Sequence, residues 1–231
     1  MTTPCTITVT KNGPYVVSGE VPLVPLRIET NAEGESVEWG QGEPRTVGGK
    51  CALCRCGESA NKPFCDGTHA RIGFDGAETA SHLTVMEQAV VLDGPTMQLA
   101  DAEVLCAFAR FCDPNGRIWN QVRDSDDPET RANLVRQAGD CPAGRLVAID
   151  KATGEAVEPA LPPSIGIVQD PSRQCSGPLW VRGGIQLIGA DGRSYELRNR
   201  MALCRCGRSE NKPFCNGAHA AEPVFQDGLA D

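Results

Sequence analysis

Two segments of the sequence contain the same set of possible metal ligands at the same spacing. Residues 52–70 read ALCRCGESANKPFCDGTHA, and residues 202–220 read ALCRCGRSENKPFCNGAHA. Each segment follows the pattern Cys-x-Cys-x8-Cys-x3-His, which places three thiols and one imidazole within 16 positions. The copies differ at four places, and none of these is a cysteine or the histidine. Each segment therefore offers a four-ligand metal site.

The ligand types and their spacing limit the metals that such a site can hold. Thiolates select zinc, Cu(I) or iron-sulfur clusters, and one imidazole leaves both zinc and iron possible. Zinc modules usually present their ligands as Cys-x2-4-Cys and His-x3-5-His pairs. A single residue between Cys54 and Cys56 instead suits extended backbone at one iron of a larger cofactor. The spacing favours an iron-sulfur cluster, with structural zinc as the alternative.

The residue after the third cysteine indicates how the second pair of ligands is positioned. Asp66 and Asn216 occupy this place in the two copies, and both residue types are common N-caps. We therefore predict a short helix that begins here and holds the histidine on the same side as the preceding cysteine. The positive N-terminal end of this helix would face an anionic cluster.

The residues between the ligands carry a family resemblance. In the first copy Ser59, Pro63 and the Cys65-Asp66-Gly67-Thr68-His69 run stand in register with the two preceding cysteines. This arrangement resembles the signature of the CDGSH iron-sulfur family, which includes mitoNEET. The second copy resembles it equally, with Asn216 and Ala218 in place of the Asp and Ser of the family name. The chain thus resembles a tandem-motif, soluble member of that family.

The resemblance implies the cofactors and their ligands. It implies two 2Fe-2S clusters, each with one iron held by the first two cysteines and the other iron held by the third cysteine and the histidine. The ligands implied in this way are Cys54, Cys56, Cys65, His69, Cys204, Cys206, Cys215 and His219. Cys51 is not included, because its counterpart in the second copy is Met201.

The resemblance also implies a fold. We expect an α+β fold, rich in strands and loops, in which two CDGSH units share a β-cap as an intramolecular pseudo-dimer around an inserted small α+β domain. The expected domains are residues 1–80 for the first unit, 81–176 for the central segment and 177–231 for the second unit. Cap strands are expected within residues 7–18 and 179–196.

Local patterns add further elements. Alternating residues predict strands at 26–29, 36–39 and 145–149. Asp127 followed by Pro128 and Glu129 is typical of a helix start, and this helix should end at Gly139. Apolar residues at helical spacing predict another helix over residues 102–111.

The central segment holds cysteines of its own. The Cys106-x5-Cys112 pattern and the Cys141-Pro142 pair resemble a divergent single-cluster 4Fe-4S ferredoxin segment. The cysteine required at position 109 is replaced by alanine, and Cys175 is the remaining source of a fourth thiol. We expect a degenerate domain without a cluster, so that iron analysis should give about four irons per chain rather than seven or eight.

Composition limits the partners and the location. The net charge of −8 provides no basic face for nucleic acid or for an anionic membrane. The N-terminal residues lack the pattern of a signal peptide, and no apolar run approaches the roughly 18 residues of a membrane span. We therefore expect a cytoplasmic monomer with an internal pseudo-two-fold axis, whose partners are redox or cluster-acceptor proteins.

These features predict a non-enzymatic protein that acts in electron transfer or cluster transfer. No nucleophile-base pair, phosphate loop or dinucleotide fingerprint accompanies the motifs. Neutral imidazole in place of a thiolate should raise the reduction potential of each cluster and make the cluster acid-labile. The alternatives are a redox or pH sensor that acts through protein contacts, and an oxidoreductase subunit with its substrate site in the central segment.

Overall fold

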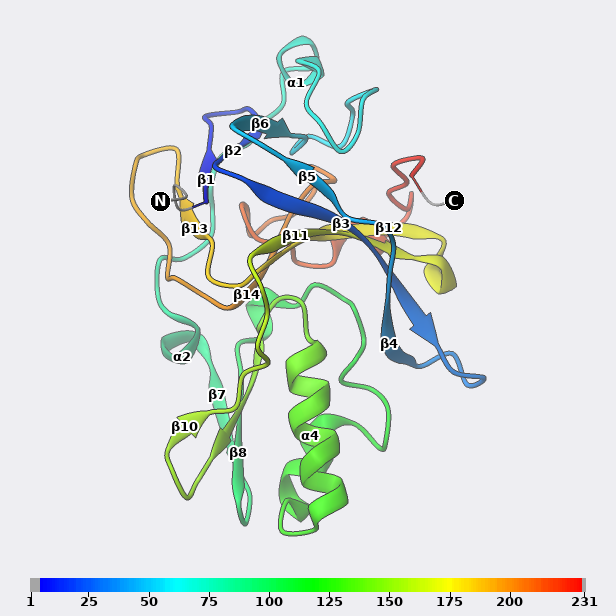
Figure 1. Ribbon diagram of the computed structural model, residues 1–231, viewed down its shortest axis with the longest axis vertical. Helices are drawn as coiled ribbons and strands as arrows, with labels where there is room; N and C mark the ends of the chain where they lie inside the picture. The colour runs from blue at the N-terminus through cyan, green and yellow to red at the C-terminus, as the bar shows by residue number, and fades with distance from the viewer. Residues whose placement is uncertain (1–4, 230–231) are drawn as a thin grey trace.

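Alternating apolar residues form the hairpin that leads to the first motif. The computed structural model describes residues 5–229, in an α+β fold with many strands and few helices (Figure 1). Strands β1 (Thr6–Val9) and β2 (Tyr15–Ser18) bury every second side chain, including Ile7 and Tyr15. Their inner faces form part of the main apolar core, because successive side chains of a strand point to opposite faces.

The first sheet combines strands from both ends of the chain. Its order is β13-β1-β2-β6, with β6 (Lys50–Leu53) antiparallel to β2. Strand β13 (Gln186–Ile188) lies parallel to β1 at the other edge. A segment more than 170 residues away in the sequence thus completes the sheet that begins the chain.

The second sheet has the order β14-β12-β11-β3-β4, and β5 also pairs with β3. Its strands are β3 (Val21–Thr30), β4 (Ser36–Gln41), β5 (Arg45–Val47), β11 (Ser164–Asp170), β12 (Cys175–Arg182) and β14 (Arg200–Leu203). The strands predicted at 26–29 and 36–39 are confirmed as parts of β3 and β4.

In each sheet, a strand from the N-terminal part of the chain pairs in parallel with a strand from the C-terminal part. Strand β3 follows β2 in the chain but pairs in parallel with β11, and β13 follows β12 but pairs in parallel with β1. The motif loops also approach each other closely. A Cβ on Gly57 would lie 2.7 Å from the carbonyl oxygen of Cys206, and one on Gly207 would lie 2.5 Å from that of Cys56. Both glycines also have positive φ, a backbone conformation that other residues rarely adopt. The close approach and the backbone conformation therefore both favour glycine at these positions.

The central segment forms a separate sheet covered by a helix. The sheet order is β10-β9-β8-β7, and Figure 1 shows these strands with α4 in the half of the molecule opposite α1 (Thr68–Arg71). The elements are α2 (Val85–Gln88), β7 (Val90–Asp93), β8 (Met97–Asp101), α3 (Ile118–Gln121), α4 (Pro128–Asp140), β9 (Leu146–Asp150) and β10 (Glu155–Ala156). Short 3-10 turns lie at η1 (Glu103–Leu105), η2 (Val122–Asp124) and η3 (Pro171–Arg173).

The predicted helix at 127–139 is confirmed as α4. The side chain of Asp127 accepts a hydrogen bond of 2.8 Å from the Thr130 N–H, which is the expected N-cap. Leu134 of this helix packs on Met97 and Leu146 of the sheet, and the predicted strand at 145–149 corresponds to β9. No helix within residues 5–229 is both long and apolar enough to cross a bilayer.

The predicted helix over residues 102–111 is wrong. Only η1 is helical, and Phe108 (φ 57°) and Arg110 (φ 64°) have left-handed backbone. Leu105, Ala107, Ala109 and Phe111 are all buried, whereas the residues between them are not, so the burial period is two. The buried residues enter different apolar clusters, which a single helical face could not reach. The helical spacing in the sequence is therefore incidental.

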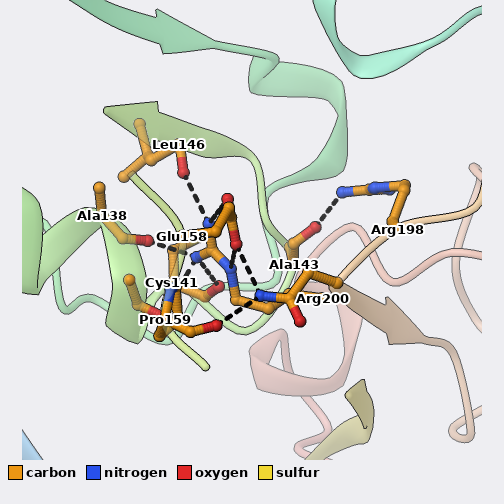
Figure 2. A network of polar contacts seen from close by, with 10 residues as sticks. Ala138, Cys141, Ala143, Leu146, Glu158, Pro159, Arg198 and Arg200 are labelled. Atoms are coloured by element: carbon orange, nitrogen blue, oxygen red, sulfur yellow. Dashed lines mark hydrogen bonds and ion pairs between the residues drawn. The ribbon is translucent and has the colours of Figure 1, made fainter. Parts of the chain in front are cut away.

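Arg200 attaches the central segment to the strand that leads into the second motif (Figure 2). Its buried guanidinium forms an ion pair of 2.5 Å with Glu158. It also donates to backbone carbonyl oxygens at the end of α4 and beyond, namely those of Ala138, Gly139, Cys141 and Leu146. Arg198 donates to the carbonyl of Ala143 in the same loop. One side chain thus fixes the loop that contains Cys141 against β14.

Arg200→Met is expected to lower the free energy of unfolding by about 3–5 kcal/mol, because it leaves Glu158 without its ion-pair partner and several buried carbonyls without their donor. Chemical denaturation measures the loss. Arg136→Met is the control, since the Arg136–Asp140 pair is 3.9 Å long and exposed, and should cost less than about 1 kcal/mol. Equal losses in the two variants would show that the Arg200 network does not hold the segments together.

Candidate metal centres

Each motif loop folds back along the strand that precedes it. In the first copy the Cys54 N–H donates to the Pro63 carbonyl (2.7 Å), and the Cys65 N–H donates to the Ala52 carbonyl (2.8 Å). In the second copy the equivalent distances, from Cys204 to Pro213 and from Cys215 to Ala202, are 2.9 and 2.8 Å. These hydrogen bonds hold the third cysteine of each motif beside the strand that precedes the motif.

The second pair of ligands lies at a very short helix. Helix α1 (Thr68–Arg71) and the 3-10 turn η4 (Ala218–Ala220) have Gly67 and Gly217 as N-caps. The prediction that Asp66 and Asn216 are the N-caps is therefore wrong by one residue, because each glycine has positive φ and ends the loop. Asp66 and Asn216 still accept the N–H two residues later, at 2.9 and 3.2 Å. Such short elements have no substantial dipole, so the prediction that a positive helix end faces the cluster is wrong.

The structure brings the predicted ligands together in pairs. The Sγ atoms of Cys54 and Cys56 are 3.7 Å apart, and so are those of Cys204 and Cys206. A tetrahedral metal with sulfur at about 2.3 Å separates two such ligands by about 3.8 Å. The third cysteine and Nδ1 of the histidine are 3.3 Å apart in the first copy and 3.4 Å in the second, close to the roughly 3.6 Å expected for S and N on one metal.

The two pairs of a motif do not point to one ion. Across residues 5–229, no three side chains of His, Cys, Asp or Glu converge on a single ion position. One tetrahedral zinc ion would need all four ligands of a motif to do so. Two pairs, each spaced for its own metal, instead fit a cofactor with two metal ions, such as a 2Fe-2S cluster.

The ionisation of the ligands fits metal binding coupled to proton release. Burial raises the pKa of Cys56 to about 11 and that of Cys215 to about 12. Burial, assisted by Arg205, lowers the pKa of His219 to about 4. The imidazole of His219 is therefore neutral at physiological pH, whereas the thiols of Cys56 and Cys215 need a nearby cation to lose their protons. Cys206 differs, because its hydrogen bond with Cys204 lowers its pKa.

Backbone groups also contact the ligand sulfurs. The N–H of Gly67 donates to Sγ of Cys65, and the N–H of Gly217 donates to Sγ of Cys215, each at 3.4 Å. Hydrogen bonds to cluster sulfurs are one means by which proteins adjust reduction potential. The two copies are the same in this respect.

A buried arginine stands between the first two cysteines of each motif. Arg55 donates to the carbonyl oxygens of Thr10 (3.0 Å) and Gly76, and its guanidinium lies 5.5 Å from the ring centre of Phe74. Arg205 lies at the same distance from Phe225. Sequence reasoning missed these arginines, although both copies keep an arginine between the ligands.

The two arginines differ in their counter-ions. Arg205 forms an ion pair with buried Asp227, which also accepts hydrogen bonds from Gln169 and Ser176. Burial opposes ionisation of Asp227, but Arg205 and these hydrogen bonds hold its pKa below the ordinary value. The position equivalent to Asp227, two residues after the phenylalanine, is Gly76 in the first copy. Within residues 5–229, Arg55 has no carboxylate at ion-pair distance, so its buried charge is uncompensated.

The two sites also differ in exposure. Cys65 and His69 are half-buried, whereas Cys215 and His219 are only 2% and 3% exposed. The central segment covers the second site: a Cβ on Gly217 would lie 3.1 Å from Cβ of Phe108, and Ala107 packs with Cys215. At Gly67, the equivalent position of the first site, nothing lies within 4 Å.

The positions of the central cysteines do not suit a 4Fe-4S cluster. Cys106, Cys112 and Cys141 line one cavity, and Ala109, which occupies the place of the missing cysteine, lines it too. The cavity has a volume of about 20 Å³, room for about one water molecule. Cys175 lines a different cavity, at the start of β12. The segment thus provides three thiols, whereas such clusters are usually held by four.

Cys51 and His82 lie apart from the ligand pairs and pack against apolar or aromatic neighbours. Cys51 lies on β6 and packs against the main apolar core. His82 stacks on Tyr195 with ring centres 4.2 Å apart. Neither residue lies in a ligand pair.

Comparison with protein families agrees with this geometry. The family described as "Iron-binding zinc finger CDGSH type" matches residues 12–70 and 176–220, and the family described as "Divergent 4Fe-4S mono-cluster" matches residues 92–151. Searches of curated proteins and of solved structures give no significant match. The fold and the paired ligands therefore define an iron-sulfur cluster-binding protein. The two outer segments thus match the CDGSH family, and the segment between them matches the divergent 4Fe-4S family.

Iron and sulfide analysis of the anaerobically purified protein is expected to give about four irons per chain, because the central cavity lacks both a fourth thiol and space. The Cys106→Ser/Cys112→Ser/Cys141→Ser variant should keep that content, whereas Cys65→Ser should lose about half of it. Seven or eight irons, reduced to four by the triple substitution, would show that the central segment also holds a cluster.

Proposed function

We propose that the chain holds one 2Fe-2S cluster in each motif and serves in electron transfer or in cluster transfer to acceptor proteins. The ligands are the eight predicted residues: Cys54, Cys56, Cys65, His69, Cys204, Cys206, Cys215 and His219. The observation that carries the proposal is that each motif presents two ligand pairs, each spaced for one tetrahedral metal, with no convergence on a single ion within residues 5–229. When bound, the cluster supplies a one-electron acceptor.

We further propose that the two units form an intramolecular pseudo-dimer, with the central segment inserted between them. The reciprocal strand exchange between the two sheets supports this arrangement. The matching approach of Gly57 to Cys206 and of Gly207 to Cys56 supports it as well. With both halves in one chain, the protein would function as a monomer, and its charge of −8 favours protein partners over nucleic acid or membrane surfaces.

The difference in exposure gives the two sites different roles in this proposal. The half-buried His69 leaves the outer ligand pair of the first site accessible to water and to an acceptor protein. The buried His219 is closed off by the central segment. The first site is the one suited to cluster donation, and the second is suited to retaining its cluster.

His69→Cys is expected to raise the acid resistance of the first cluster and to slow cluster transfer to an apo-ferredoxin, because protons compete with iron for imidazole in the native protein. Visible absorbance during a pH titration measures the first effect, and the absorbance or EPR signal of the re-isolated ferredoxin measures the second. His219→Cys is the matched control and should change transfer much less. Unchanged acid stability in the His69 variant would contradict the role of the histidine, and a protein that passes electrons but no cluster would be an electron carrier.

The unequal counter-ions of the arginines predict unequal reduction potentials. Arg55 brings an uncompensated positive charge to the first site, whereas Arg205 is neutralised by Asp227, so reduction should be easier at the first site. One charge near a buried redox centre, at an effective dielectric constant of about 20, corresponds to a shift on the order of 50–100 mV.

Arg55→Gln should therefore lower the potential of the first cluster by on the order of 50 mV. The double variant Arg205→Gln/Asp227→Asn removes a neutral pair and should change the second potential by clearly less. EPR-monitored redox titration measures both potentials, each assigned in chains with one intact site (Cys65→Ser or Cys215→Ser). Equal shifts from the single and double variants would rule out the counter-ion explanation.

A further inference from the structure

A groove far from the ligand pairs lies between the second sheet and the central segment. It has a volume of about 730 Å³ and is lined by β4, the C-terminal half of α4, residues 157–161 and two side chains of β12. This volume is within the range of about 300–1,000 Å³ that is usual for small-molecule sites. None of the eight predicted metal ligands lines it.

The wall of the groove carries aromatic rings. The ring centres of Trp39 and Trp180 are 4.7 Å apart, and Phe111 stacks against Trp39 at 4.7 Å. Val135 and Leu161 add apolar surface beside them. Trp39 is only half-buried, so part of its surface is available for stacking with a planar group.

Two hydrogen-bond donors at this groove lack acceptors. Arg182 is 6% exposed, and its Nε donates to Ser164 Oγ at 2.9 Å. Within residues 5–229, its two terminal nitrogens have no acceptor, and no carboxylate lies within 4.0 Å. The buried indole N–H of Trp180 also has no partner there, whereas that of Trp39 donates to the Asp140 carbonyl. The terminal nitrogens of Arg182 are not fully buried, so they can donate to the acceptor atoms of a ligand in the groove.

Two of the three acidic side chains of the groove already face an arginine, whereas Arg182 has no carboxylate partner among residues 5–229. Glu158 is held by Arg200 at 2.5 Å, and Asp140 lies 3.9 Å from Arg136. Glu38 is exposed. Burial without a counter-ion lowers the pKa of Arg182, which reflects the same lack of an anion. The guanidinium also lies over the Trp180 ring, 5.1 Å from its centre, so the cation and the aromatic surface are adjacent.

We propose that this groove binds a planar aromatic anion, whose ring packs against the exposed part of Trp39 and whose carboxylate or phosphate accepts hydrogen bonds from Arg182. The planar fork of a guanidinium suits bidentate contact with either anionic group. The proposal does not depend on the function proposed for the metal centres, because it uses none of their residues.

Equilibrium dialysis of the purified protein against three matched pairs of probes tests the proposal. The pairs are flavin mononucleotide and riboflavin, AMP and adenosine, and anthranilate and 2-aminobenzamide. In at least one pair the anion should bind about tenfold or more tightly than its neutral counterpart. Arg182→Gln should abolish that difference, Arg182→Lys should keep part of it, and Trp39→Leu should weaken both members of the pair. Arg193→Gln, which removes an exposed arginine elsewhere, should change nothing.

The comparison within the native chain needs no variant, so it remains decisive even if a substitution at Arg182 prevents folding. The proposal is overturned if no anion binds more tightly than its neutral counterpart. It is also overturned if a folded Arg182→Gln protein keeps the full preference, since the anion would then be held by another group.

Discussion

The constraint on which the rest of this structure depends is the return of each motif loop along its own strand. Four metal ligands within 16 residues would collapse onto one ion if the loop were free to close around it. The hydrogen bonds between Cys54 and Pro63 and between Cys65 and Ala52 prevent this, because they hold the third cysteine beside the strand. The strand end then positions one pair of ligands, and the turn at Gly67 positions the other. The two-metal site proposed for each motif would then follow from backbone pairing.

The strands that hold these loops depend in turn on the opposite half of the chain. The first sheet receives β13 from the second unit, and the second sheet receives β3, β4 and β5 from the first. Gly57 and Gly207 let the motif loops touch without a side chain between them. The apolar core that joins the sheets includes residues of both units, such as Tyr15, whose hydroxyl donates to the carbonyls of Cys204 and Pro213. Neither ligand loop is therefore supported by its own unit alone.

Features set by neighbouring residues could be predicted from the sequence, and features set by distant contacts could not. The ligand spacing and the Asp127-Pro128 helix start are local, and the structure agrees with both. The helix predicted over residues 102–111 is wrong because the apolar residues of this segment belong to separate clusters formed by distant strands. The uncompensated charge of Arg55 could not be predicted either, since it depends on which residue stands at position 76, 21 residues later.

Duplication within one chain lets the two sites change independently, which a homodimer does not allow. In a symmetric dimer every substitution changes both sites, whereas here each copy can change alone. The residues that the copies keep are those that set ligand geometry: the ligands, the arginine between them and the glycine at the turn. The surroundings that differ set charge and access. Asp227 stands where the first copy has Gly76, and the central segment covers Gly217 but not Gly67. Because the differences lie around the ligands and not among them, the two sites have diverged in their surroundings while their ligand geometry has stayed the same.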